Sequence, residues 1–193
     1  MGEPIIVKLH GCSGAGKTTI ARHIMENAAK VHVVTNQKGG HEAYVCEIEG
    51  FPLPLAVLGS YQNACGGMDT VSSQDEAIKL IDYYHGEGCH VFHEGLLQST
   101  YYGKMGQHSV PFGDRYIYAF LMTPIDVCLS RVEERRRANN STNKFNPELT
   151  IDKWNTINRL RGRVRMLGHN VYEWDSTMGT MPQIRSLYLK EGN

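Results

Sequence analysis

The feature that most constrains this chain is a glycine-rich octapeptide close to its N-terminus. Residues 11–18 read GCSGAGKT and match the phosphate-binding pattern G-x-x-x-x-G-K-[ST]. An apolar stretch at residues 5–10 precedes the motif, and apolar residues at helical spacing follow it at 19–29. A strand, this loop and a helix in that order are typical of a P-loop, in which backbone N–H groups and a helix N-terminus surround phosphates.

The P-loop interpretation predicts a nucleotide site. We expect Lys17 to reach the β- and γ-phosphates of ATP and the Thr18 hydroxyl to hold Mg²⁺, so ATP and Mg²⁺ are the expected cofactors. A glycine-rich turn without a ligand is the alternative, but the lysine, the hydroxyl and both flanking elements agree with a P-loop. The residues expected to contact the nucleotide are Gly11, Ser13, Gly14, Ala15, Gly16, Lys17, Thr18 and Thr19.

The rest of the chain alternates between strand and helix patterns, apart from one predicted β-hairpin at residues 43–59. This alternation predicts an α/β fold with a mostly parallel sheet, helices on both faces and a hairpin insertion, in one domain spanning residues 1–193. Further strands are predicted at 31–35, 89–95, 116–122 and 171–174, and further helices at 72–85, 96–107, 124–138, 150–167 and 181–190.

Capping residues mark the expected starts of three helices. Ser72 or Ser73 is expected to cap the helix that ends near residue 85, and Thr150 the long helix near the C-terminus. Pro124 is expected at the first helical position of its helix, where a missing N–H costs nothing.

Two carboxylates are candidates for catalysis. Glu94 ends a predicted central strand, where the P-loop fold usually keeps an Asp as the partner of Mg²⁺. A Glu there favours a general-base or water-bridged role over direct coordination of Mg²⁺, and a solvated strand end is the alternative. Asp69 lies in a loop with paired glycines. It is expected either to accept the proton of a substrate hydroxyl or, with Thr70, to cap the following helix.

Charge is unevenly distributed along the chain. Residues 131–165 contain ten Lys/Arg and four Asp/Glu, a net charge of +6, so the remainder of this formally neutral chain carries −6. The pattern favours a local anion site over a general nucleic-acid-binding surface. Arg131, Arg135 and Arg136 are expected to neutralise a transferring phosphoryl group from a lid at residues 131–147, and a solvated basic helix end is the alternative.

Composition narrows the class of protein further. No apolar run approaches the ~20 residues of a membrane span, and the first strand begins too early to leave room for a signal peptide. The five cysteines form no CxxC pair, which indicates reduced thiols. His90 and His93 face opposite sides of a strand, and no zinc site is expected. We therefore expect a cytoplasmic protein with no membrane partner, and its oligomeric state stays open.

The P-loop, Glu94 and the arginine cluster before a polar loop together resemble the P-loop kinases of the nucleoside and nucleotide kinase group. The resemblance covers most of the chain. More narrowly, Gly59-x-Tyr61, residues 65–70 (CGGMDT) and residues 93–96 (HEGL) are similar to phage P-loop kinases that phosphorylate 5-hydroxymethyluracil in DNA. This resemblance implies a kinase that transfers the γ-phosphoryl group of ATP to a hydroxymethyl group in DNA, within the cytoplasm of a phage-infected host.

A base carried in DNA would have to leave the helical stack to reach such a site. The chain offers a polar, aromatic loop as a platform for the base and several cations for the flanking phosphates, although the loop also reads as an ordinary polar connection. The candidates for the base are Tyr61, Gln62 and Asn63, and those for the phosphates are Lys144, Arg159 and Arg163.

Two other functions stay open at this point. The close alternative is a kinase of a free nucleoside, nucleotide or other small metabolite. The alternative from another class is a P-loop NTPase that works as a switch or motor. A switch GTPase needs a guanine-binding N-K-x-D-type motif, and residues 36–39 (NQKG) lack the Asp.

Overall fold

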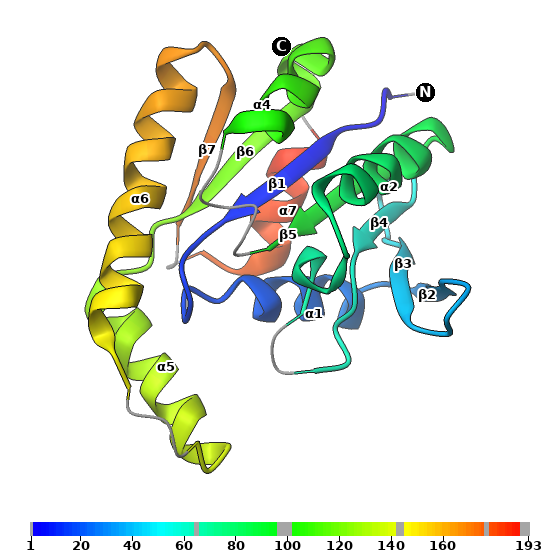
Figure 1. Ribbon diagram of the computed structural model, residues 1–193. Helices are drawn as coiled ribbons and strands as arrows, with labels where there is room; N and C mark the ends of the chain where they lie inside the picture. Colours follow the sequence, from blue (N-terminus) through cyan, green and yellow to red (C-terminus); the bar gives the residue numbers. More distant parts are fainter. Residues whose placement is uncertain (1, 64–65, 96–101, 142–144, 176–177, 190–193) are drawn as a thin grey trace.

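The computed structural model describes residues 2–63, 66–95, 102–141, 145–175 and 178–189, and within them a seven-stranded sheet lies at the centre (Figure 1). The strand order is β2-β3-β4-β5-β1-β6-β7, and pairing is parallel from β4 to β7. The α/β prediction is thereby confirmed. The strands are β1 (Ile6–His10), β2 (Lys30–Thr35), β3 (His41–Glu47), β4 (Leu55–Leu58), β5 (His90–Glu94), β6 (Tyr116–Leu121) and β7 (Asn170–Trp174).

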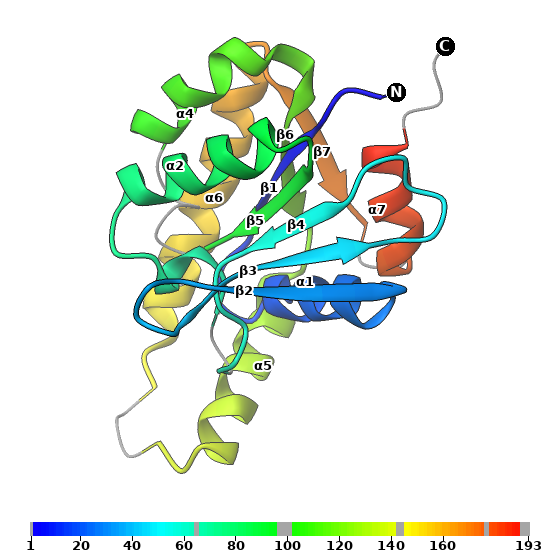
Figure 2. The ribbon, with the colours of Figure 1, turned by 90° about the vertical axis from the view of Figure 1, so that its right-hand side faces the viewer.

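Helices cover both faces of this sheet. Figure 2 shows α2, α4 and α6 on one side and α1 and α7 on the other. The helices are α1 (Lys17–Glu26), α2 (Gln74–Gly86), α4 (Gly103–Ser109), α5 (Ile125–Ala138), α6 (Pro147–Met166) and α7 (Thr180–Tyr188), with short 3₁₀ turns η1 (Met68–Thr70) and η2 (Val110–Arg115).

The alternation of side chains along β1 explains the two hydrophobic cores. Ile6 packs with residues of α2 and α6, whereas Val7 and Leu9 pack with α1 and α7. All five residues of β1 are buried, as they are in β5, because both faces of a central parallel strand are covered. Because β1 and β5 are parallel neighbours, their C-terminal ends lie side by side, where the glycine loop begins.

The other edge of the sheet differs from a simple α/β pattern. β3 and β4 form the predicted hairpin, but β2 also pairs antiparallel with β3, so the three strands form a meander. β2 is the outermost strand and is largely exposed, with Val33 48% accessible. The apolar residues at 31–35 predicted a strand. They did not predict that this strand would lie at the exposed edge of the sheet.

Three helix starts test the capping predictions. Ser73 accepts a hydrogen bond from the Glu76 N–H and caps α2, which confirms one of the two expected residues. The prediction for Thr150 is wrong, because Asn146 caps α6 and Thr150 lies buried one turn inside the helix. Pro124 is the N-cap of α5, one position before the expected one.

Part of the predicted helix at 96–107 lies outside the described residues, which resume at residue 102, and its described end is α4. Within the described part of the chain, no helix is long and apolar enough to span a membrane.

Candidate active site

The predicted P-loop lies between the end of β1 and the start of α1. The ammonium of Lys17 folds back over the loop and donates to the carbonyl oxygens of Gly11 at 2.9 Å and Cys12 at 3.2 Å. Because α1 begins at Lys17, the first N–H groups of the helix point into the loop and find no carbonyl within the helix. These donors and the lysine make the loop an anion site of the expected kind.

Gly14 shows why this loop needs glycine. Its φ is +80°, and a Cβ at this position would lie 2.2 Å from the carbonyl oxygen of Cys128 on α5. Thr123, just before α5, donates from Oγ1 to the Ala15 carbonyl at 2.9 Å. The loop is thus held against the segment that carries the arginines.

Glu94 stands next to the P-loop at the end of β5. The hydroxyl of Thr18 donates to Glu94 Oε1 at 3.2 Å, and the side chain of Glu94 is buried. Burial raises the pKa of the Glu94 carboxyl to about 7. Nearby Asp69 raises it further, whereas Lys17 and the Thr18 hydroxyl lower it. The solvated strand-end alternative for Glu94 is therefore wrong.

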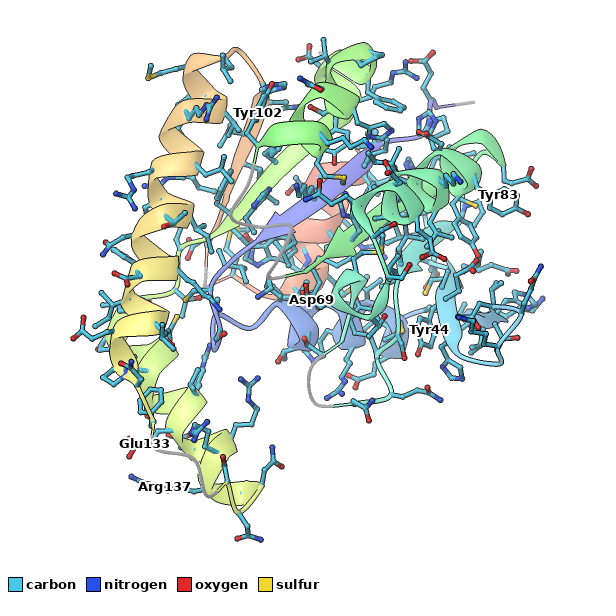
Figure 3. The ribbon with its side chains drawn as sticks, viewed as in Figure 1. Tyr44, Asp69, Tyr83, Tyr102, Glu133 and Arg137 are labelled. Atoms are coloured by element: carbon cyan, nitrogen blue, oxygen red, sulfur yellow. The ribbon has the colours of Figure 1, made fainter. Side chains whose placement is uncertain are left out.

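Asp69 reaches the same place from the η1 turn, near the middle of the molecule (Figure 3). A Cβ on Gly95 would lie 3.0 Å from Asp69 Oδ1, and one on Gly67 would lie 2.7 Å from Glu94 Oε1. The two glycines therefore allow the η1 segment to pack against the end of β5. The capping alternative is wrong for Asp69 and Thr70, because Ser73 caps α2 and the Thr70 hydroxyl bonds to the Gly67 carbonyl.

A cleft of ≈ 820 Å³ joins these groups. The P-loop, the two carboxylates, α5 and the end of β7 all contribute residues to its lining. This volume is in the range typical of small-molecule sites. Its lining includes Cys12, Ser13, Gly14, Ala15, Gly16, Lys17, Thr18, Thr19, Asp69, Glu94, Leu121, Thr123, Arg131, Arg135, Trp174 and Met178.

Two of the three predicted catalytic arginines line the cleft. Arg131 donates to the Gly14 carbonyl at 3.4 Å, and Arg135 follows one turn later on the same face of α5. The prediction for Arg136 does not fit, because its guanidinium lies over the Phe145 ring, 6.0 Å from the centroid, and it does not line the cleft. Arg137 is bound to Glu133 at 2.7 Å, far along α5 from Asp69 (Figure 3).

The predicted base platform is not assembled as expected. Tyr61 is only 5% exposed and packs against Tyr44, whose hydroxyl accepts from the Tyr61 N–H, so the ring has no free face for a base. The side-chain amide of Gln62 is at 3.2 Å from the His41 ring, and the Asn63 carbonyl accepts from Arg22. Neither Gln62 nor Asn63 lines the cleft.

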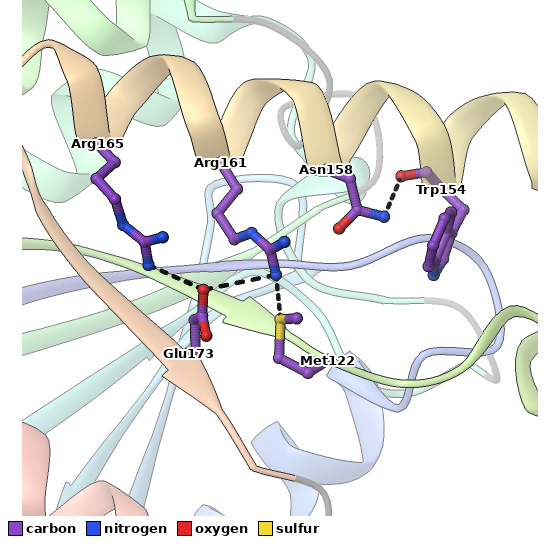
Figure 4. A network of polar contacts seen from close by, with 6 residues as sticks. All are labelled: Met122, Trp154, Asn158, Arg161, Arg165 and Glu173. Carbon is purple, nitrogen blue, oxygen red and sulfur yellow. Dashed lines mark hydrogen bonds and ion pairs between the residues drawn. The ribbon is translucent and has the colours of Figure 1, made fainter.

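The structure also does not bring the three candidate phosphate ligands together at the cleft. Lys144 lies outside the described residues. Arg163 lies over the Tyr102 ring at 5.4 Å, and neither Arg163 nor Arg159 lines the catalytic cleft. Figure 4 shows that two other arginines of the basic segment, Arg161 and Arg165, instead reach Glu173 on β7.

Sequence reasoning missed the wall formed by the end of β7. Trp174 and Met178 line the cleft, and the buried side chain of Gln183 on α7 bonds to the residue that follows Trp174. The Gln183 side chain accepts from the Asp175 N–H and donates to the Asp175 carbonyl, both at 2.8 Å. A tryptophan that ends the last parallel strand was the available signal, because ligands of such sheets bind at strand ends.

Fold and site together define a class of protein. A phosphate-binding loop after the central strand, a carboxylate at the end of the neighbouring strand and arginines on the helix across the cleft are the features of a P-loop, nucleotide-kinase-like protein. Comparisons with known proteins identify the family within this class.

Residues 2–174 match the family model described as 5-hmdU DNA kinase. A 5-hmdU DNA kinase of Pseudomonas phage PaMx11 is 33% identical over 159 residues, which is 80% of this chain and 82% of the relative. Another, from Pseudomonas phage M6, is 29% identical over 182 residues, 89% of this chain and 92% of the relative. The chain therefore belongs to the 5-hmdU DNA kinase family and is a phosphotransferase, which confirms the resemblance drawn from short motifs.

Proposed function

We propose that this protein transfers the γ-phosphoryl group of ATP to the hydroxymethyl group of 5-hydroxymethyluracil in DNA, with Mg²⁺ as cofactor. The observation that carries the proposal is the position of two carboxylates, Glu94 and Asp69, beside the P-loop lysine in one cleft. Membership of the 5-hmdU DNA kinase family supports the choice of acceptor. The free-nucleoside kinase and the NTPase switch have no comparable support.

The P-loop would bind the triphosphate. Lys17 would exchange its bonds to the Gly11 and Cys12 carbonyls for charge-assisted bonds to phosphate oxygens, which are about twice as strong as neutral ones. Arg131 and Arg135 would approach the same phosphates from α5, where cations stabilise the charge of the transition state.

The Thr18 hydroxyl and the Glu94 carboxylate fit Mg²⁺, because they place two oxygen ligands of the kind this ion prefers 3.2 Å apart at the phosphate site. When bound, the ion would neutralise the triphosphate. This contact favours a role for Glu94 in holding the metal. Asp69, which lies beside it on η1, is then the group that we expect to accept the proton of the attacking hydroxyl.

Transfer from γ-labelled ATP tests the function directly. Single-stranded DNA containing 5-hydroxymethyluracil should become labelled, whereas ordinary DNA should not, and the free nucleoside should be a much poorer acceptor. Activity on DNA should fall with added salt, because each phosphate contact releases counterions. Equal labelling of the free nucleoside, without any salt dependence, would favour a small-molecule kinase.

Lys17→Ala provides the matched negative control for this assay. The variant should fold, because the lysine contributes hydrogen bonds to its own loop and little apolar packing, and it should lose phosphoryl transfer. Near-normal turnover by the folded variant would refute the P-loop as the donor site.

A further inference from the structure

In addition to Lys17 and the two arginines of α5, the catalytic cleft is lined by Arg22 on α1. Arg22 is half-buried. Thr18, whose hydroxyl bonds to Glu94, precedes it by four residues, so both side chains lie on one face of the helix. A further cation therefore follows the proposed metal-binding hydroxyl along the same helix face.

The guanidinium of Arg22 is held by the segment that leads into η1. Its Nη2 donates to the Tyr61 carbonyl at 3.2 Å and to the Asn63 carbonyl at 2.8 Å. A guanidinium has five N–H donors, and among the described residues those on Nε and Nη1 have no partner. Nor does any ion pair between described residues include Arg22. The cleft is thus offered an oriented cation with donors to spare.

The segment that holds Arg22 lies close to both carboxylates of the site. Burial raises the pKa of the Tyr61 hydroxyl well above its usual value, and the nearby charges of Glu94 and Asp69 raise it further. Arg131 instead bonds to a carbonyl of the P-loop. Arg22 is therefore attached to the part of the cleft that carries the proposed general base, whereas Arg131 is attached to the loop that binds the donor phosphates.

We infer that Arg22 binds the 5′ phosphate of the modified nucleotide in the DNA strand. In a pyrimidine nucleotide of the usual anti conformation, the C5 substituent lies on the same side of the base as this phosphate. A strand that brings its hydroxymethyl group to Asp69 therefore brings the phosphate to the same part of the cleft, where Arg22 can donate charge-assisted hydrogen bonds to it. This inference rests on the proposed function, and it names a group that DNA has and a free nucleoside lacks.

Two single-stranded oligonucleotides that differ by one charge provide the test. Both carry one 5-hydroxymethyluracil, and in one of them a neutral methylphosphonate replaces the phosphate on its 5′ side. For the wild-type protein, kcat/KM should be roughly 10- to 100-fold lower with the neutral form, which is the usual contribution of a hydrogen bond to a charged group. The same replacement several nucleotides away should have little effect.

Arg22→Gln should lower kcat/KM for the charged oligonucleotide by a similar factor and leave the value for the neutral one nearly unchanged, because the two changes remove the same contact. The KM for ATP should stay at the wild-type value. The slope of log kcat/KM for DNA against log salt should become shallower by about 0.7, the amount expected for one phosphate contact of a single strand. Arg22→Lys keeps the charge and should retain most of the preference for the charged form.

Arg185→Gln is the matched control. Arg185 lies on α7, on the same side of the sheet as α1 (Figure 2), and its guanidinium lies over the Phe51 ring, 5.9 Å from the centroid, outside the cleft. This variant loses the same charge and should keep the wild-type preference between the two oligonucleotides. Thermal melting checks the folding of each variant.

The outcomes separate the inference from the proposed function. If the wild-type protein labels neither oligonucleotide, the proposed function is wrong. If it labels both equally well, the function stands and the phosphate contact is overturned, whatever the variants do. A folded Arg22→Gln variant that discriminates between the two as the wild type does would also overturn it, because Arg22 would then only hold the carbonyls of residues 61 and 63. So would a fall in kcat with an unchanged KM for DNA, which would place Arg22 at the transferring phosphoryl group.

Discussion

Replacing Lys8 with methionine is expected to stabilise the protein. Lys8 lies in the middle of β1, 2% exposed, between His93 on β5 and Tyr118 on β6. Its ammonium nitrogen has no hydrogen-bond partner among the described residues and lies 6.0 Å from the centroid of the Tyr118 ring. Burial lowers the pKa of Lys8 from 10.5 to about 7, because a charge in an apolar interior loses its hydration.

The size of the effect follows from this pKa. Each tenfold change in proton affinity is worth about 1.4 kcal/mol, so a fall from 10.5 to about 7 corresponds to roughly 5 kcal/mol. The unfolded chain holds the proton more tightly than the folded protein. Stability should therefore rise with pH between about 7 and 10.5, by up to about 1.4 kcal/mol per pH unit, and the full cost should be present below pH 7. Methionine fills similar space without a charge, so Lys8→Met should gain a few kcal/mol near neutral pH.

Denaturant unfolding between pH 6.5 and 9 measures this directly, as the difference between the wild-type protein and the variant. That difference should shrink as pH rises. Lys30→Met is the control, because Lys30 is exposed on β2 beside Glu47 and its removal should change stability by well under 1 kcal/mol. A Lys8→Met variant that is less stable than the wild type at pH 7, or a difference that does not vary with pH, would refute the reasoning.

Three further predictions concern the active site. Asp69→Asn should reduce turnover about 10²–10⁴-fold, the usual contribution of a general base, with little change in the Mg²⁺ concentration needed for half-maximal activity. Glu94→Gln should slow the reaction and also raise the Mg²⁺ concentration needed for half-maximal activity. The reverse pattern in the two variants would make Glu94 the general base and Asp69 the metal ligand. Arg131→Ala should lower kcat more than it raises the KM for ATP. Arg137→Ala is the control and should match the wild type, because Arg137 is paired with Glu133. A large effect of Arg137→Ala would mean that the phosphate contacts lie further along α5 than proposed.

The sequence predicted those parts of the site that depend on short-range signals. The P-loop is contiguous in the chain, so its pattern alone identifies Lys17 and Thr18 as candidates, although α1 begins at Lys17, two residues before the expected start. Glu94 was also predictable, because a buried strand that ends in a carboxylate brings that group to the edge where parallel strands end. Arg131 and Arg135 followed from helical spacing, since residues four apart share one face.

Other features depended on contacts that spacing does not report. Tyr61 sits in a polar loop, but the Tyr44 hydroxyl, 17 residues earlier, bonds to its backbone and the ring is buried. Lys8 occurs in an apolar strand, and its exposure of only 2% depends on the elements that pack over that face of the sheet.

The geometry of Lys17 indicates why the site can be assembled before any nucleotide binds. A buried ammonium without partners would destabilise the loop, as Lys8 illustrates, but Lys17 is held by two carbonyl oxygens of the loop that it serves. Phosphate oxygens offer the Lys17 nitrogen stronger, charge-assisted bonds. Nucleotide binding therefore replaces the hydrogen-bond partners of Lys17 and leaves its charge paired throughout. Thr18 and Glu94 are likewise already in contact at 3.2 Å. Binding energy is then not spent on ordering these groups and remains available to stabilise the transition state.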